Sequence, residues 1–267
     1  MSERKSIFIT GGGSGIGRDA AIYFAERGWF VGLADIDEDG MRVTRDMINN
    51  GFTHMHRLDV RDREAWDEAL NAFSIAAGGR IDVVFNNAGI ANGGPLIENP
   101  QGEIDQMLAV NLNGVIYGAQ AAHSHLKKTA PGSALINTAS LAGIVGAPGL
   151  AAYCATKWGV RGLTESLDAE WAEDGIKVAA ICPGFIDTPL IEQTLQDSNQ
   201  SMKENLANAG AEISPVSDVS KVVWDAVHGD NLHYTVGKTA GRLMFLKRWL
   251  PGKVRKQMRE QGVGGDL

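Results

Sequence analysis

Short runs of apolar and β-branched residues alternate with longer segments of helical periodicity, and this alternation limits the possible folds more than any other feature of the chain. The expected strands are residues 6–10, 29–34, 54–58, 81–85, 134–138, 177–181 and 233–236. The expected helices are residues 15–27, 38–50, 63–77, 101–128, 151–173 and 217–228. Short strands that are apolar on both faces are typical of a parallel sheet, and right-handed crossovers place helices on both of its sides. The pattern therefore predicts an α/β fold with one doubly wound parallel sheet of about seven strands, and a single domain over residues 1–267.

Composition excludes several classes of protein. The chain has 267 residues, of which 44% are apolar and 21% are charged, as in globular proteins with a large core. A net charge of −7 argues against a nucleic acid as the main partner. Two cysteines, Cys154 and Cys182, fit a reducing compartment, and no apolar run approaches the roughly 20 residues of a membrane span. We therefore expect a cytoplasmic protein.

A glycine-rich turn follows the first expected strand. In residues 10–17, Thr-Gly-Gly-Gly-Ser-Gly-Ile-Gly, the glycines Gly15 and Gly17 begin a G-x-G-x-x-A pattern that ends at Ala20. Such a turn lets a phosphate approach the backbone N–H groups at a helix N-terminus, and its place after strand one favours a Rossmann-type dinucleotide site. Asp35 ends the second strand, where a carboxylate accepts hydrogen bonds from the adenosine ribose and repels a 2′-phosphate. We therefore predict NAD rather than NADP.

A tyrosine and a lysine four residues apart provide candidate acid–base chemistry. Tyr153 and Lys157 lie on one face of an expected helix. A nearby ammonium favours the phenolate, so we expect Lys157 to lower the pKa of Tyr153. Ser140 follows a strand end and is placed to donate to a substrate oxygen. A second Tyr-x-x-x-Lys pair, Tyr234 and Lys238, is interrupted by a glycine, and we interpret it as structural.

Five motifs in one order resemble those of the short-chain dehydrogenases/reductases. They are the glycine turn, the Asn-Asn-Ala-Gly segment at residues 86–89, Ser140, the Tyr153/Lys157 pair and the Pro-Gly pair at residues 183–184. The resemblance covers about residues 5–237. It implies a catalytic set of Ser140, Tyr153, Lys157 and Asn111, in which Asn111 kinks the long helix and completes a water relay to Lys157. It also implies a homo-oligomer, either a tetramer or a dimer.

The same resemblance, together with the glycine turn and Asp35, predicts the residues that bind NAD. Asp59 and Val60 are expected at the adenine, and residues 183–188 at the carboxamide and pyrophosphate. The predicted cofactor-binding residues are Gly11, Ser14, Gly15, Ile16, Gly17, Asp35, Ile36, Asp59, Val60, Asn87, Ala88, Gly89, Tyr153, Lys157, Pro183, Gly184, Ile186 and Thr188. No metal site is expected, because His54 and His56 have no third ligand spaced nearby. His123 and His125 are expected on different faces of a helix.

The expected substrate loops are residues 90–96, 141–150 and a lid at 187–215, and they are largely apolar or uncharged. We therefore predict a hydrophobic secondary alcohol or its ketone as substrate. Two alternatives stay open: a 3-oxoacyl-carrier-type reductase, and an NAD-binding regulator without turnover.

The last thirty residues differ in charge from the rest. Residues 238–267 carry eight Lys or Arg and two acids, a net charge of +6, which leaves −13 on residues 1–237. Leu243, Leu246, Leu250, Val254 and Met258 form an apolar stripe against this basic face, and Pro251 is expected to divide the helix. This basic amphipathic tail is predicted either to dock beside the substrate cleft or on a sister subunit, or to contact a membrane surface.

Overall fold

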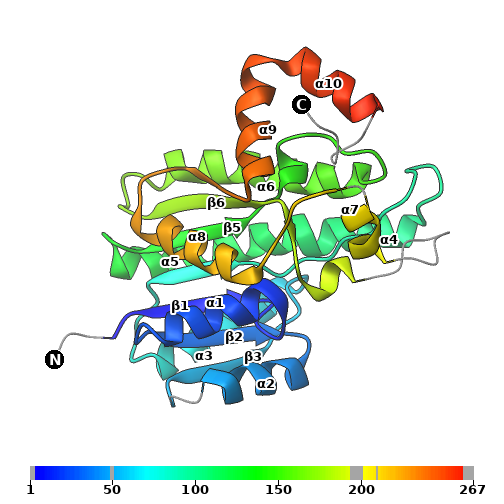
Figure 1. Cartoon of the computed structure of the whole chain (residues 1–267). Coiled ribbons are helices and arrows are strands. Elements are labelled where there is room, and N and C mark those ends of the chain that lie inside the picture. The colour runs from blue at the N-terminus through cyan, green and yellow to red at the C-terminus, as the bar shows by residue number, and fades with distance from the viewer. Residues whose placement is uncertain (1–3, 49–50, 193–200, 209, 261–267) are drawn as a thin grey trace.

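A seven-stranded parallel sheet forms the centre of the computed structural model, which describes residues 4–48, 51–192, 201–208 and 210–260. The strand order is β3-β2-β1-β4-β5-β6-β9 (Figure 1). The strands are β1 Ser6–Thr10, β2 Phe30–Asp35, β3 Thr53–Arg57, β4 Val83–Asn86, β5 Ala134–Thr138, β6 Lys177–Pro183 and β9 His233–Val236. Each neighbouring pair is parallel. The predicted α/β Rossmann-type fold is confirmed.

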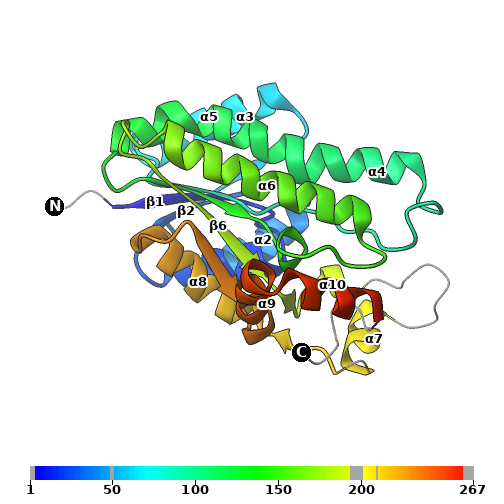
Figure 2. The ribbon, with the colours of Figure 1, turned by 90° about the horizontal axis from the view of Figure 1, so that it is seen from above.

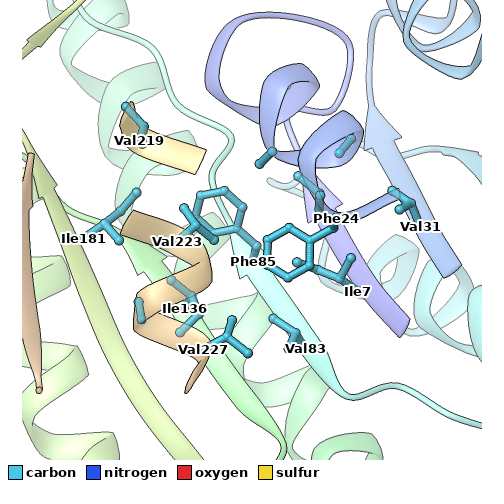
Figure 3. Packing of buried hydrophobic residues seen from close by; sticks show 14 of the residues in the cluster. Ile7, Phe24, Val31, Val83, Phe85, Ile136, Ile181, Val219, Val223 and Val227 are labelled. Carbon is cyan, nitrogen blue, oxygen red and sulfur yellow. The ribbon is translucent and has the colours of Figure 1, made fainter. Parts of the chain in front are cut away.

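Helices cover both faces of this sheet (Figure 2). One layer contains α1 Gly15–Ala25, α2 Glu38–Ile48 and α8 Val216–His228. The other contains α3 Arg63–Ala76, α5 Gly114–Thr129 and α6 Ala151–Glu170. Successive strand residues point to opposite faces, so Ile7 and Ile9 pack with the first layer, and Phe8 packs with the second. Figure 3 shows the first core, where Phe24 of α1 and Val223 of α8 meet Phe85 of β4.

The long helix predicted at residues 101–128 is divided. It consists of α4 Gln101–Leu108, a π-helical segment Ala109–Asn113, and α5. A π-helical turn adds one residue to the helical repeat, which a search for apolar periodicity does not detect. The helix irregularity predicted at Asn111 is thus a π-helical turn. The Asn111 side chain is fully buried there.

The predicted lid lies only partly within the described residues. Its described elements include α7 Met202–Asn208 and β8 Ile213–Ser214, and β8 pairs with β7 Phe185–Ile186, which directly precedes the predicted lid. Residues 193–200 and 209 are outside the described part of the chain. The function of this segment as a lid stays a prediction.

The basic tail forms two helices, α9 Lys238–Trp249 and α10 Pro251–Glu260, which are separated at Pro251 as predicted. Leu243, Val254 and Met258 are buried in one cluster with Leu141 and Val145 of a predicted substrate loop. The described part of the tail thus docks on its own chain, beside the substrate loop. Residues 261–267, which the predicted tail includes, lie outside the described part of the chain. In the described residues, no helix is long and apolar enough to cross a membrane.

Candidate active site

The glycine turn between β1 and α1 requires its glycines for different reasons. Gly11 and Gly15 have positive φ angles of 69° and 50°, which residues with side chains rarely adopt. Gly17 is packed so closely that a Cβ atom would lie 2.0 Å from the carbonyl oxygen of Gly11. The turn is also bound to the segment that follows β4, the strand beside β1 in the sheet, because the Asn87 side chain donates to the Thr10 carbonyl at 3.0 Å. The result is a rigid, open cradle of backbone N–H groups, and such a cradle suits a pyrophosphate.

Asp35 ends β2 and lies directly beside the glycine turn. Its Oδ2 accepts a hydrogen bond from the Gly13 N–H at 2.9 Å, and its Oδ1 accepts one from the Asp37 N–H at 3.0 Å. These bonds fix the carboxylate orientation and connect it to the glycine turn.

A cavity of about 380 Å³ is lined by both the glycine turn and Asp35. It brings together most of the predicted cofactor residues: Gly11, Ser14, Gly15, Ile16, Asp35, Ile36, Asp59, Val60, Asn87, Ala88, Gly89 and Thr188. Gly17 does not line it, since this residue is covered by the turn. The remaining predicted residues, Tyr153, Lys157, Pro183, Gly184 and Ile186, line an adjoining cavity that shares Ile16, Asn87, Gly89 and Thr188 with the first.

Sequence reasoning missed several residues of this cleft. Gln106 and Val110 reach it from the divided helix, and Pro189 and Leu190 follow Thr188. Arg61 also lines it and forms a fork with Asp59, with Nε–Oδ1 at 2.9 Å and Nη2–Oδ2 at 2.6 Å. Hydrogen bonding to Arg61 is the main cause that lowers the pKa of Asp59. The sequence offered one signal for Arg61: it stands two residues after Asp59, which places opposite charges close together in the loop after β3.

Ser140, Tyr153 and Lys157 meet in the adjoining cavity. Ser140 follows β5, and its Oγ accepts from the Ala142 N–H at 3.1 Å and is hydrogen bonded to the phenol group of Tyr153. Lys157 is 3% exposed, and its Nζ donates to the Thr138 carbonyl at 2.9 Å. The same Nζ lies 5.6 Å from the centre of the Tyr153 ring.

The pKa of Tyr153 differs from the prediction. Burial raises it to about 12, opposed by the hydrogen bond with Ser140, and Lys157 does not lower it. The expectation of a lowered pKa was wrong because burial removes water from the phenol and disfavours its charged form, and the hydrogen bond with Ser140 offsets this only in part. Burial also lowers the pKa of Lys157, to about 8. In this structure the phenol is a proton donor at neutral pH.

Asn111 forms its hydrogen bonds with the loop that follows β4. Its Nδ2 donates to the Ile90 carbonyl at 2.7 Å, and its Oδ1 accepts from the Ile90 N–H at 2.9 Å. A Cβ atom on Gly89 would meet both Asn111 Oδ1 at 3.3 Å and Lys157 Nζ at 3.7 Å. Asn111 therefore holds the loop after β4 beside Lys157, and its water relay stays a prediction.

The cavity around the phenol has mainly apolar walls and holds about 140 Å³ of space. The apolar wall residues are Ile90, Ala91, Leu141, Ala142, Val145, Ala147, Leu150, Phe185, Ile186, Leu190 and Ile191. Among the described residues, Lys157 is its only lysine or arginine. Ile144, from the same predicted loop, is instead buried against the tail.

Two features outside the cavity have structural partners. The Tyr234 hydroxyl accepts from the Asn231 N–H at 3.0 Å, and the Lys238 N–H donates to Glu212. His123 pairs with Asp174 at 2.7 Å. The described part of the chain contains no group of three or more His, Cys, Asp or Glu residues suited to a metal ion.

Comparison with known proteins places this geometry in a family. Residues 5–199 match the family model for short chain dehydrogenases. An (S)-acetoin-forming diacetyl reductase of Staphylococcus aureus is 33% identical over 252 residues, which are 90% of this chain and 96% of that protein. The probable oxidoreductase EphD of Mycobacterium tuberculosis is 36% identical over 190 residues, but this chain spans only 32% of its length.

Two solved structures are similar over most of the chain. Levodione reductase has a TM-score of 0.80 and 28% identity, with 90% of this chain and 97% of that chain covered. A 3-ketoacyl-(acyl-carrier-protein) reductase from Brucella melitensis, complexed with NADH, has a TM-score of 0.77 and 26% identity, with 88% and 97% covered. The chain belongs to the short-chain dehydrogenase/reductase family of oxidoreductases.

Proposed function

We propose that this chain is an NAD-linked oxidoreductase that interconverts a hydrophobic secondary alcohol and its ketone. The observation that carries the proposal is the apolar cavity that closes on Ser140, Tyr153 and Lys157 and is continuous with the cleft ending at Asp35. A diacetyl reductase and a levodione reductase among the similar proteins support a small ketone as substrate.

The chain's own residues supply the proton and the orientation. Ser140 donates a hydrogen bond to the substrate oxygen, and the protonated phenol of Tyr153 gives that oxygen a proton during ketone reduction. Lys157 stabilises the resulting phenolate when it is charged, and Asn111 keeps the adjacent loop in place. A bound nicotinamide supplies the hydride to the carbonyl carbon in this direction and accepts it in the other.

The glycine turn and Asp35 support NAD as the cofactor. Asp35 would place a negative charge against a 2′-phosphate, and the guanidinium of Arg61 is already paired with Asp59. The residues therefore fit NAD better than NADP.

A 3-oxoacyl-carrier-type reductase is the second candidate, favoured by the similar fold of the Brucella protein. That protein is complexed with NADH, so Asp35 alone does not separate the two candidates. A regulator without turnover is the third, and detection of any turnover excludes it.

A panel of ketones and alcohols tests the proposal through the absorbance of reduced nicotinamide. We expect turnover of small apolar ketones, with NADH used in preference to NADPH. Tyr153→Phe is expected to lower kcat by about 10²- to 10⁴-fold while retaining cofactor binding. Tyr234→Phe, in the second Tyr-x-x-x-Lys pair, is the matched control and is expected to stay near wild type. Activity restricted to carrier-bound substrates would select the second candidate, and an active Tyr153→Phe enzyme would refute the proposed chemistry.

A further inference from the structure

The junction of α9 and α10 exposes aromatic and aliphatic side chains together. Residues 247–253 are all exposed, and Phe245, Trp249 and Leu250 are exposed by 63%, 63% and 42%. The rings of Phe245 and Trp249 lie 6.4 Å apart. We call residues 245 and 247–253 the α9–α10 corner. Figure 1 shows it projecting from the end of the molecule opposite to α2.

Docking of the tail does not explain these side chains. The tail uses Leu243, Val254 and Met258 to pack on the body, where they are 2%, 2% and 9% exposed. The corner residues are the outward part of the same two helices. Large apolar groups that gather on an exposed convex surface indicate contact with another phase or partner.

The corner is also strongly basic. Lys247, Arg248 and Lys253 belong to it, and Arg248 lies over the Trp249 ring at 5.6 Å. Among the described residues, the tail forms one ion pair, Lys256–Glu260 at 4.0 Å, and Lys247, Arg248 and Lys253 have no carboxylate partner there.

An adjacent groove has the same charge. It holds about 500 Å³ between the tail and residues 145–148 of the substrate loop, and its cations are Lys247, Arg255 and Arg259. No acidic residue of the described chain lines it. Such a groove suits a phosphate group, and through Lys247 it adjoins the corner.

We propose that the α9–α10 corner binds the surface of an anionic lipid bilayer. Tryptophan and phenylalanine favour the headgroup region of a membrane, and lysine and arginine bind lipid phosphates. The remaining 237 residues carry a net charge of −13 and are repelled by the same surface. This charge separation orients the molecule with the tail toward the lipid.

Flotation of the full-length protein with vesicles tests the proposal. We expect binding to vesicles of phosphatidylcholine with phosphatidylserine, no binding to phosphatidylcholine alone, and weaker binding at high salt. The triple variant Lys247→Gln/Arg248→Gln/Lys253→Gln is expected to bind roughly fivefold more weakly for each cation removed. Phe245→Ser/Trp249→Ser is expected to lose binding. Ile75→Ser is the matched control, because Ile75 is 82% exposed and belongs to α3, a helix far from α9 and α10 (Figure 1).

Three outcomes would overturn the proposal: no binding of wild type, equal binding to uncharged vesicles, or corner variants that bind like wild type. Light scattering identifies the main competing occupant. If the corner variants dissociate an oligomer while vesicles are not bound, the corner is instead an interface between copies. Ketone reduction by the same samples is expected to be unchanged, so failure of lipid binding leaves the proposed function standing.

Discussion

Replacement of Gly17 by alanine tests whether the glycine turn is defined by packing. The new Cβ would lie 2.0 Å from the Gly11 carbonyl oxygen and 2.9 Å from the Asn87 Nδ2. A carbon and an oxygen normally stay about 3.3 Å apart, so the turn and α1 must separate by roughly 1.3 Å. Neither contact can be relieved by rotating a flexible side chain, because Gly11 contributes backbone and Asn87 is held by Thr10.

This displacement has two measurable consequences. Overpacking costs about 1–3 kcal/mol, which corresponds to a fall in Tm of roughly 2–12 °C in a protein of this size. The displaced N–H groups also lose their alignment with a pyrophosphate, and an error of about 1 Å can cost 100-fold in a positioned site. We therefore expect weaker NADH binding in addition to lower stability.

Thermal unfolding and NADH fluorescence titration measure the two effects. Gly102→Ala in α4 is the matched control, because a Cβ there meets nothing within 4 Å and alanine favours a helix. This control is expected to keep or raise Tm and to bind NADH like wild type. A Gly17→Ala protein with unchanged Tm and unchanged affinity would refute the packing argument.

Three further predictions concern the cofactor rim, the buried lysine and the tail. Asp35→Ala is expected to weaken NAD binding by about 10- to 100-fold, the value of a hydrogen bond to a charged group, and to reduce the preference over NADP, as titration with both cofactors would show. Burial lowers the pKa of Lys157 to about 8, so between pH 8 and about 10.4 the unfolded chain binds more protons than the folded one. Urea unfolding should therefore show stability rising across this window relative to Lys157→Met, and a flat difference would contradict the burial effect. Leu243→Ala should cost about 2–5 kcal/mol in the same assay, whereas Phe245→Ala, at an exposed position, should cost less than about 1 kcal/mol.

Local patterns were sufficient for the sheet and for most of the site. The strand Ser6–Thr10 has three consecutive apolar residues at its centre, and such a run identified it as a strand buried on both faces of a parallel sheet. The glycine turn and Asp35 were found because each follows a strand, and parallel strands bring their carboxyl ends to one edge. The sequence did not predict that Gly17 packs against the backbone of Gly11, because a glycine motif does not distinguish a glycine that faces a ligand from one that faces backbone.

Properties that depend on burial or on distant partners were not predictable. The spacing of Tyr153 and Lys157 correctly placed them together, but the sign of the phenol pKa shift depends on the depth of the cavity. The place of Arg61 in the cleft was not predictable from local sequence, because it depends on how the loop after β3 folds against the neighbouring strand ends. The apolar stripe of the tail was recognised, yet periodicity does not reveal what a stripe packs against.

The cluster shared by α9, α10 and the substrate loop lies in a different part of the sequence from the proposed proton-transfer residues. Leu243, Val254 and Met258 support Leu141 and Val145 from behind, whereas Tyr153 and Lys157 are carried by α6. The family match ends at residue 199, well before these two helices begin. The described residues of the tail do not line the cavity, so they affect its wall only through Leu141 and Val145. We therefore expect exchange of the last thirty residues to change the support of that wall, while Tyr153 and Lys157 keep their place on α6.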